Sequence, residues 1–91
     1  LANRTSSAPK ISSRIVGKHC ETGDILIREI ELESDIVPGD LLATPATGAY
    51  GRSMATNYNH VPRPPVIAVK DGKARVILRR ETEADLLGLD I

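Results

Sequence analysis

The chain has 91 residues, of which 41% are hydrophobic and 26% charged, and these values are typical of one small globular domain. Its 12 basic and 12 acidic side chains cancel, so no basic field attracts a nucleic acid or an anionic membrane, and we expect neither partner. Phe and Trp are absent and Tyr occurs only twice, so the modest core that a chain of this length can bury must be aliphatic.

The cysteine content and the start of the chain indicate the compartment. Cys20 is the only cysteine, which excludes an internal disulfide and agrees with a reducing compartment, so we expect the cytoplasm. No apolar run approaches the roughly 20 residues that cross a bilayer, and residues 1–5 lack the apolar centre of a signal peptide. Because the chain begins with Leu1 and a polar stretch, we expect a fragment of a longer protein, with residues 1–10 flexible or leading in from a missing part.

Short aliphatic runs predict strands in the first half of the chain. Residues 11–16 and 24–32 are expected to form the first two. Regular alternation along the second strand predicts apolar side chains on both sides of the sheet, with Leu26, Ile30 and Leu32 on one side and Ile25 and Ile27 on the other. Both sides are therefore expected to be partly buried.

A turn and a short helix are expected next. The sequence Val37-Pro38-Gly39-Asp40 fits a type II turn, because proline presets the first central residue and glycine supplies the positive φ of the second. Residues 41–44 are predicted to form a further strand. Residues 51–57 contain no proline and predict one or two helical turns, which the prolines from Pro62 onward prevent from continuing.

The second half of the chain carries a hairpin signal. Residues 65–69 and 74–78 are predicted strands, and Asp71-Gly72 between them is the strongest short-range signal for a type I′ turn. Thr82, followed three residues later by Asp85, approximates a capping box and predicts a short terminal helix. The expected fold is mainly β, a small antiparallel β-barrel or sandwich with about five strands and two short helices.

Two polar, glycine-punctuated clusters at residues 17–24 and 47–51 form the candidate functional site. Both follow or separate strand-like runs, and a rigid sheet commonly presents reactive side chains where a strand ends. The first cluster contains Cys20, whose thiol can act as nucleophile, proton donor or metal ligand, beside the carboxylate of Glu21. The second contains Tyr50 between two glycines, where a phenol could lie near an anion such as a phosphate.

Simpler interpretations of the same residues remain open. Cys20 fits a small buried hydrophobe, Glu21 a solvated carboxylate, and Tyr50 a core aromatic whose hydroxyl finds a partner at the edge of the domain. A zinc site is disfavoured, because His19 and Cys20 are adjacent and would point to opposite sides of an extended chain. We therefore expect no metal.

Taken together, these motifs resemble a known family. The sequence Gly-Lys-His-Cys-Glu-Thr-Gly-Asp at residues 17–24, the turn at 37–40, Thr-Gly-Ala-Tyr ending at Tyr50, and Asn57-Tyr58-Asn59 resemble the carboxy-terminal part of the diaminopimelate decarboxylases. These enzymes belong to the alanine-racemase-like (fold type III) class of pyridoxal-phosphate decarboxylases. The related ornithine and arginine decarboxylases usually carry aspartate after the cysteine, so Glu21 favours the diaminopimelate branch.

The resemblance implies a function and site residues. It implies decarboxylation of meso-2,6-diaminopimelate to L-lysine and CO₂, the last step of lysine biosynthesis, with pyridoxal 5′-phosphate as cofactor. It implies a homodimer whose active sites are shared across the interface. Cys20 would be the proton donor, Glu21 would contact the distal end of the substrate, and Tyr50 would lie beside the cofactor phosphate and the substrate. Residues 57–59 would give structural support.

The resemblance also implies what the chain leaves out. The Schiff-base lysine and the TIM-like barrel that carries it would lie outside these residues, so the chain alone is expected to be inactive. Family members complete this domain with strands from their amino terminus, so exposed sheet edges are expected here. The alternatives are an ornithine- or arginine-type decarboxylase of the same class, and a non-catalytic β-domain used for dimerisation.

Overall fold

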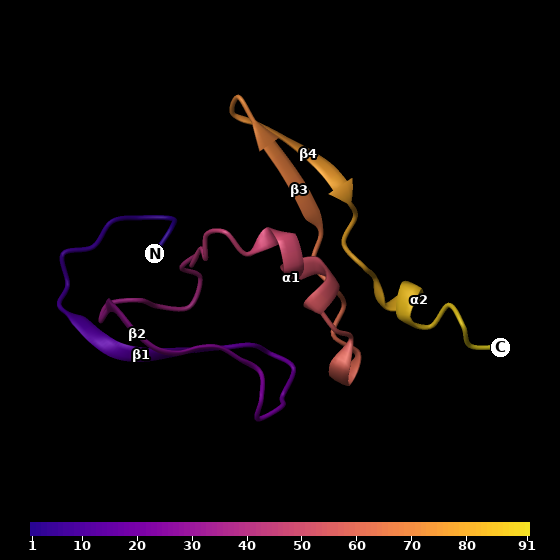
Figure 1. Ribbon diagram of the computed structural model, residues 1–91, viewed down its shortest axis with the longest axis horizontal. Helices are drawn as coiled ribbons and strands as arrows, with labels where there is room; N and C mark the ends of the chain where they lie inside the picture. The colour runs from indigo at the N-terminus through magenta and orange to yellow at the C-terminus, as the bar shows by residue number, and fades with distance from the viewer. The chain divides into compact units, whose positions relative to one another are not determined.

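The computed structural model describes residues 1–91. Along the chain the elements are β1 (Lys10–Val16), β2 (Ile25–Glu33), α1 (Gly48–Met54), the 3₁₀ helix η1 (Tyr58–His60), β3 (Val66–Lys70), β4 (Lys73–Leu78) and α2 (Glu83–Leu86). The strands pair as two separate antiparallel sheets, β1–β2 and β3–β4 (Figure 1). The mainly β class with two short α-helices is therefore confirmed, although the sheets do not close into a barrel.

The chain divides into two compact units, Leu1–Ala46 and Thr47–Ile91. No residue is buried as a whole, and aliphatic residues such as Leu26, Val69 and Leu89 are exposed. The aliphatic core expected from the composition is therefore absent from these residues. The reason is that each sheet has only two strands, and a two-stranded hairpin needs a further layer to cover its apolar side.

An irregularity in the β1–β2 ladder decides which way the side chains of β2 face. Ser13 pairs with Ile30 but Ile15 pairs with Ile27, so β2 contains one residue more than β1 over this stretch. Such a β-bulge shifts the alternation and brings Ile27 to the same side of the sheet as Ile30. The predicted placement of Ile27 opposite Ile30 and Leu32 is wrong, because it assumed a regular ladder.

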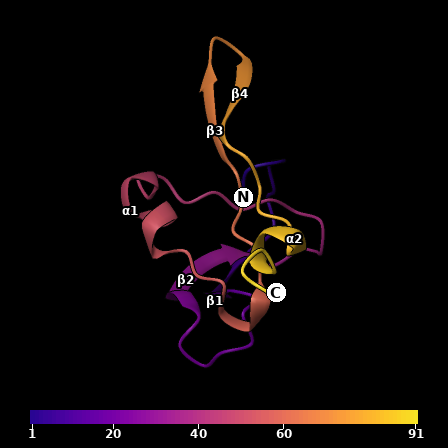
Figure 2. The same ribbon diagram turned by 90° about the vertical axis from the view of Figure 1, so that its right-hand side faces the viewer.

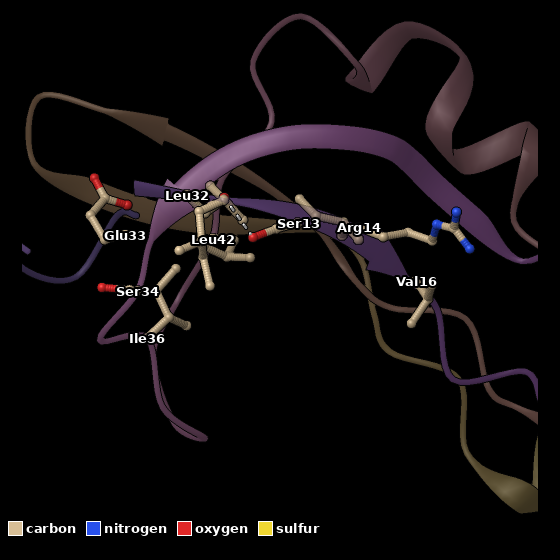
Figure 3. Close-up of a pocket in the computed structure, with 10 residues that line it drawn as sticks. Ser13, Arg14, Val16, Leu32, Glu33, Ser34, Ile36 and Leu42 are labelled. Atoms are coloured by element: carbon tan, nitrogen blue, oxygen red, sulfur yellow. Dashed lines mark hydrogen bonds between the residues drawn. The ribbon is translucent and has the colours of Figure 1, made fainter. Parts of the chain in front are cut away.

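One side of the first unit holds an open concavity of about 420 Å³. Leu32, Ile36 and Leu42 gather at one end of it, and Arg14 and Val16 lie toward the other (Figure 3). The lining is largely aliphatic, and neither Cys20 nor Glu21 belongs to it. This concavity is thus a feature of the apolar side of the sheet and is separate from the loop that carries the candidate site.

The segment before β1 is bonded to the turn that follows β2. The Arg4 Nη2 donates to Asp40 Oδ2 at 2.8 Å, the Arg4 Nη1 lies 3.3 Å from Asp35 Oδ2, and the Asn3 amide donates to Asp40 at 3.1 Å. The Asp40 side chain is only 7% exposed, and the Arg4 guanidinium holds the pKa of that carboxyl well below its usual range. These bonds hold Asn3 and Arg4 against the turn that follows β2. That residues 1–10 are flexible or lead in from a missing part stays a prediction.

The turn after β2 is the type II turn expected from its sequence. Gly39 has φ +100°, and the Asp40 N–H donates to the Val37 carbonyl at 3.1 Å. The strand predicted at residues 41–44 is wrong, since these residues lie outside both sheets. The Ala2 N–H donates to the Leu41 carbonyl at 2.8 Å, but a ladder requires such bonds to repeat along a partner strand.

The β3–β4 hairpin and the cap of α2 are confirmed. Asp71 and Gly72 have φ of +52° and +70°, as the two central residues of a type I′ turn require, and the hairpin extends as a two-stranded ribbon (Figure 2). The Thr82 hydroxyl accepts the Asp85 N–H at 3.3 Å, and the Asp85 carboxylate accepts the Thr82 N–H at 2.8 Å. Both signals depend on neighbouring residues, which explains why the sequence was sufficient to predict them.

The helix α1 begins three residues earlier than predicted, at Gly48 instead of residue 51, and it ends at Met54. The Gly51 N–H donates to the Thr47 carbonyl at 3.0 Å, so the glycine-containing first turn is already helical. Ala55, with ψ 140°, ends it. The low helix propensity of glycine conceals such a first turn in the sequence.

Candidate functional site

Residues 17–24 form the loop that joins β1 to β2, and we call them the Cys20 loop. The Gly17 N–H donates to the Asp24 carbonyl at 2.9 Å and closes the base of the loop. The Asp24 N–H donates to the Glu21 carbonyl at 3.1 Å and forms a turn within it. The hairpin therefore carries Cys20 and Glu21 together on one compact loop at a strand end, as the sequence predicted.

The side chain of Asp24 is hydrogen-bonded to His19 within the same loop. Its Oδ2 accepts the His19 backbone N–H at 3.1 Å and lies 2.9 Å from His19 Nδ1. The backbone hydrogen bond, followed by the ring contact, lowers the pKa of the Asp24 carboxyl below its usual value. Gly17 lies directly against this carboxylate, and a methyl group added to it would overlap the carboxylate atoms. Gly17 thus leaves the space that the Asp24 side chain fills.

Cys20 adopts the left-handed backbone conformation, with φ +55°, and is exposed. This conformation costs a non-glycine residue on the order of 1 kcal/mol, so the surrounding loop must hold it. Its exposure contradicts the interpretation of Cys20 as a small buried hydrophobe. The thiol is accessible to a molecule that approaches the loop.

The Glu21 carboxylate is oriented by its own turn. Its Oε2 accepts the Gly23 N–H at 2.7 Å, and the Thr22 hydroxyl lies 3.4 Å from Oε1. A carboxylate has about four lone-pair positions, so it can accept further hydrogen bonds while these contacts set its direction. Chemically, this is an exposed and preoriented anion, suited to a charge-assisted hydrogen bond from an ammonium group.

Tyr50 lies on α1 in the second unit, and the residue is 74% exposed. Tyr50 is therefore not a core aromatic within this chain. Its exposed phenol can donate one hydrogen bond to a phosphate or carboxylate oxygen. Cys20 and Glu21 belong to the first unit. A site that combines all three residues stays a prediction.

A polar cluster that includes Asn57, one of the residues expected to give structural support, lies beside the end of α1. Glu81 Oε2 accepts the Asn57 amide at 2.7 Å and the Arg63 backbone N–H at 2.8 Å. Arg63 Nε donates to the carbonyl of Ala55, the residue that caps α1, at 2.9 Å. The bonds from Arg63 and Asn57 lower the pKa of Glu81. No local pattern connects Arg63 with a carboxylate 18 residues later, so sequence reasoning had no signal for this cluster.

Two further features of the structure concern metal binding and membrane insertion. Residues 1–91 contain no group of three or more His, Cys, Asp or Glu side chains arranged to hold a metal ion. None of the helices combines the length and the apolar character that a membrane span requires.

Comparison with protein families assigns the class. Residues 1–48 match the family described as pyridoxal-dependent decarboxylase, C-terminal sheet domain, and this match includes the Cys20 loop. It covers more than half of the chain. The chain belongs to this family, as the resemblance of its motifs indicated.

Individual relatives give a more specific comparison than the family does. The chain is 54% identical over 91 residues to diaminopimelate decarboxylase of Mycobacterium tuberculosis, covering 100% of the chain and 20% of that protein. It is 49% identical over 90 residues to the enzyme of the same name from Bacillus subtilis, covering 99% and 20%. A crystal structure of diaminopimelate decarboxylase matches with a TM-score of 0.74 at 32% identity, over 96% of this chain and 22% of that one. The chain spans about a fifth of the length of these relatives.

Proposed function

We propose that this chain is the sheet-domain part of a diaminopimelate decarboxylase, an enzyme that forms L-lysine and CO₂ from meso-2,6-diaminopimelate. The observation that carries the proposal is the 54% identity to such an enzyme along the entire chain, both polar clusters included. Pyridoxal phosphate, when bound, supplies the electron sink for the charge left as CO₂ departs. The residues of this chain would complete that chemistry from the side of the sheet domain.

Cys20 is the proton donor in this proposal. Its Sγ–H bond breaks as a C–H bond forms at the α-carbon that has lost CO₂, and the thiolate left behind recovers a proton from solvent. Thiols have pKa values of about 8.5, which lie near enough to neutral pH for efficient general acid catalysis. The exposure of Cys20 and its left-handed backbone at the tip of the loop support this role.

Glu21 and Tyr50 bind the substrate and cofactor. The Gly23 N–H, at 2.7 Å, orients the Glu21 carboxylate. This carboxylate accepts a hydrogen bond from the ammonium group at the distal end of the substrate, and it thereby selects for a substrate with an amino group at each end. The Tyr50 phenol donates its one hydrogen bond to a phosphate oxygen of the cofactor and lies beside the substrate, for which its 74% exposure leaves it available. These residues fit the cofactor as hydrogen-bonding partners, and its covalent attachment falls to a lysine outside this chain.

We further infer that the enzyme is a cytoplasmic homodimer in which Cys20 serves the active site of the partner subunit. A thiol on an exposed hairpin loop can reach a cleft formed by another polypeptide, and the absence of buried residues agrees with a domain completed by other segments. The single cysteine of the chain agrees with a reducing compartment.

The test uses the full-length protein that carries this chain, reconstituted with pyridoxal phosphate. We expect CO₂ release and stoichiometric L-lysine from meso-diaminopimelate, and little release from ornithine or arginine. Cys20→Ala should lower kcat about 100-fold or more with a change in KM of less than about threefold, because the proton transfer follows binding. Ser7→Ala, an equally small change at an exposed residue, should leave both constants unchanged.

The competing functions give different outcomes. Preferential turnover of ornithine or arginine would replace the proposal with the related decarboxylase activity. A folded dimer that releases CO₂ from none of these substrates would reject a catalytic role and leave a domain used for dimerisation.

A further inference from the structure

We propose that Asp24 is a positioning residue, which holds the Cys20 loop so that the Cys20 thiol points toward the reacting carbon. This inference rests on the proposed function, because it assigns a purpose to the orientation of a proton donor. It concerns a carboxylate that makes no contact with substrate or cofactor in that proposal. Three independent features of the loop support it.

The first feature is the pair of contacts that Asp24 makes with the residue before Cys20. Its Oδ2 accepts the His19 backbone N–H at 3.1 Å and contacts the His19 ring at 2.9 Å, so one oxygen holds both the main chain and the side chain of His19. The side chains of His19 and Asp24 are only 25% and 22% exposed, although the chain as a whole buries no residue. This shielding strengthens the contacts relative to those of a fully solvated pair.

The second feature is the space at Gly17. A side chain there would occupy the position of the Asp24 carboxylate, while the Gly17 N–H bonds to the Asp24 carbonyl at 2.9 Å. Residue 17 thus binds the backbone of Asp24 and leaves room for its side chain. The carboxylate has a defined place at the base of the loop, which a solvated surface carboxylate lacks.

The third feature is the conformation of Cys20 itself. With φ +55°, the residue holds a backbone shape that L-amino acids disfavour, by roughly 1–2 kcal/mol. If His19 is released from Asp24, we expect Cys20 to relax toward negative φ, which turns its Cα–Cβ bond and redirects the thiol. Asp24 fixes the residue on one side of Cys20, and the turn at residues 21–24 fixes the other.

Glu21 is held differently, and this difference makes the proposal specific. The Glu21 carboxylate is oriented by the Gly23 N–H, and the Asp24 side chain takes no part in that contact. Loss of the Asp24 carboxylate should therefore misdirect the proton donor more than the substrate-binding carboxylate. The expected signature is a lower kcat with KM nearly unchanged.

The experiment compares Asp24→Ala, Asp24→Asn and His19→Ala in the full-length holoenzyme, with Asp90→Ala at an exposed position as the matched control. We expect Asp24→Ala to lower kcat about tenfold or more, with KM within about threefold of the parent. Asp24→Asn keeps an oxygen for the His19 N–H and should recover part of the loss. His19→Ala keeps the backbone bond and should likewise be intermediate.

A second measurement follows the thiol directly. The rate of Cys20 alkylation by iodoacetamide, read by mass spectrometry of its peptide, should change by at least about threefold in Asp24→Ala and remain at the parent value in Asp90→Ala. Equal alkylation rates together with unchanged kcat would overturn the inference, as would an Asn variant no better than Ala. A normal kcat in Cys20→Ala would instead refute the proposed proton donor, and the alkylation rates would still decide whether Asp24 orients the thiol.

Discussion

The Glu81 carboxylate accepts two hydrogen bonds from Arg63, one from the backbone N–H at 2.8 Å and one from the guanidinium Nη1 at 3.1 Å. Arg63 also bonds to the carbonyl of Ala55 at the end of α1, the helix that carries Tyr50. The segment after β4 is thereby connected to the end of α1. We infer that this cluster, and not the short helix alone, maintains the local structure around Tyr50, since a helix of this length is marginal by itself.

We predict that Glu81→Ala loosens this region. It removes the acceptor of the Arg63 backbone N–H and one acceptor each of the Arg63 guanidinium and the Asn57 amide, and a partly shielded donor that loses its partner is destabilising. Amide hydrogen exchange across residues 55–63 of the full-length protein should become about five- to tenfold faster. Glu31→Ala, at an exposed position of β2, should leave exchange in that segment unchanged. Equal exchange in the two variants would show that the cluster does not stabilise the segment that follows α1.

Acid should weaken the contact between Arg4 and Asp40. The pKa of Asp40 is held below its ordinary value of 3.8 by the Arg4 guanidinium, so the folded state binds a proton less readily than the unfolded one. The stabilisation is present above the unfolded pKa of about 4 and is lost as the pH falls through the folded pKa. The melting temperature of the full-length protein should fall below about pH 4, and less steeply in Asp40→Asn. A pH slope in Asp40→Asn identical to that of the parent protein would contradict the assignment.

Gly17→Ala should reproduce the effect of removing the Asp24 carboxylate. The added methyl would overlap that carboxylate and displace it from His19, so kcat should fall about tenfold while substrate binding is largely kept. A double-mutant cycle with Asp24→Ala provides the control, because the methyl has room once the carboxylate is gone. The two effects should then be strongly non-additive. Full additivity would mean that Gly17 matters for a reason unrelated to Asp24.

Glu21→Asp should affect substrate binding more than turnover. The side chain becomes one methylene shorter, which would withdraw the carboxylate from the distal ammonium group of the proposed substrate. Steady-state kinetics should show KM for meso-diaminopimelate rising about tenfold with kcat changed less. Glu31→Asp, the same change on the exposed side of β2, should leave both constants at the parent values. A normal KM for Glu21→Asp would show that Glu21 does not contribute to substrate binding.

Local sequence patterns predicted where the strands lie, but not which side of the sheet every side chain of β2 faces. The ends of the four observed strands were predicted to within one residue, because aliphatic runs bounded by polar turns are a local signal. The predicted side of the sheet for Ile27 was wrong, because the bulge opposite Arg14 depends on how β1 and β2 pair. The strand predicted after Asp40 failed for a related reason, since its formation requires a partner strand that these residues do not have.

By itself, the sequence determined the features that adjacent residues encode: the type I′ turn at Asp71-Gly72, the capping box of Thr82 and Asp85, and the loop motif that identified the family. Only the tertiary structure decided that Asp24 fills the space beside Gly17, that Cys20 is held in a left-handed conformation, and that Arg63 meets Glu81. A turn or a cap follows from the preferences of a few neighbouring backbone angles. Contacts between residues separated along the chain exist only once the folded backbone has set their distance.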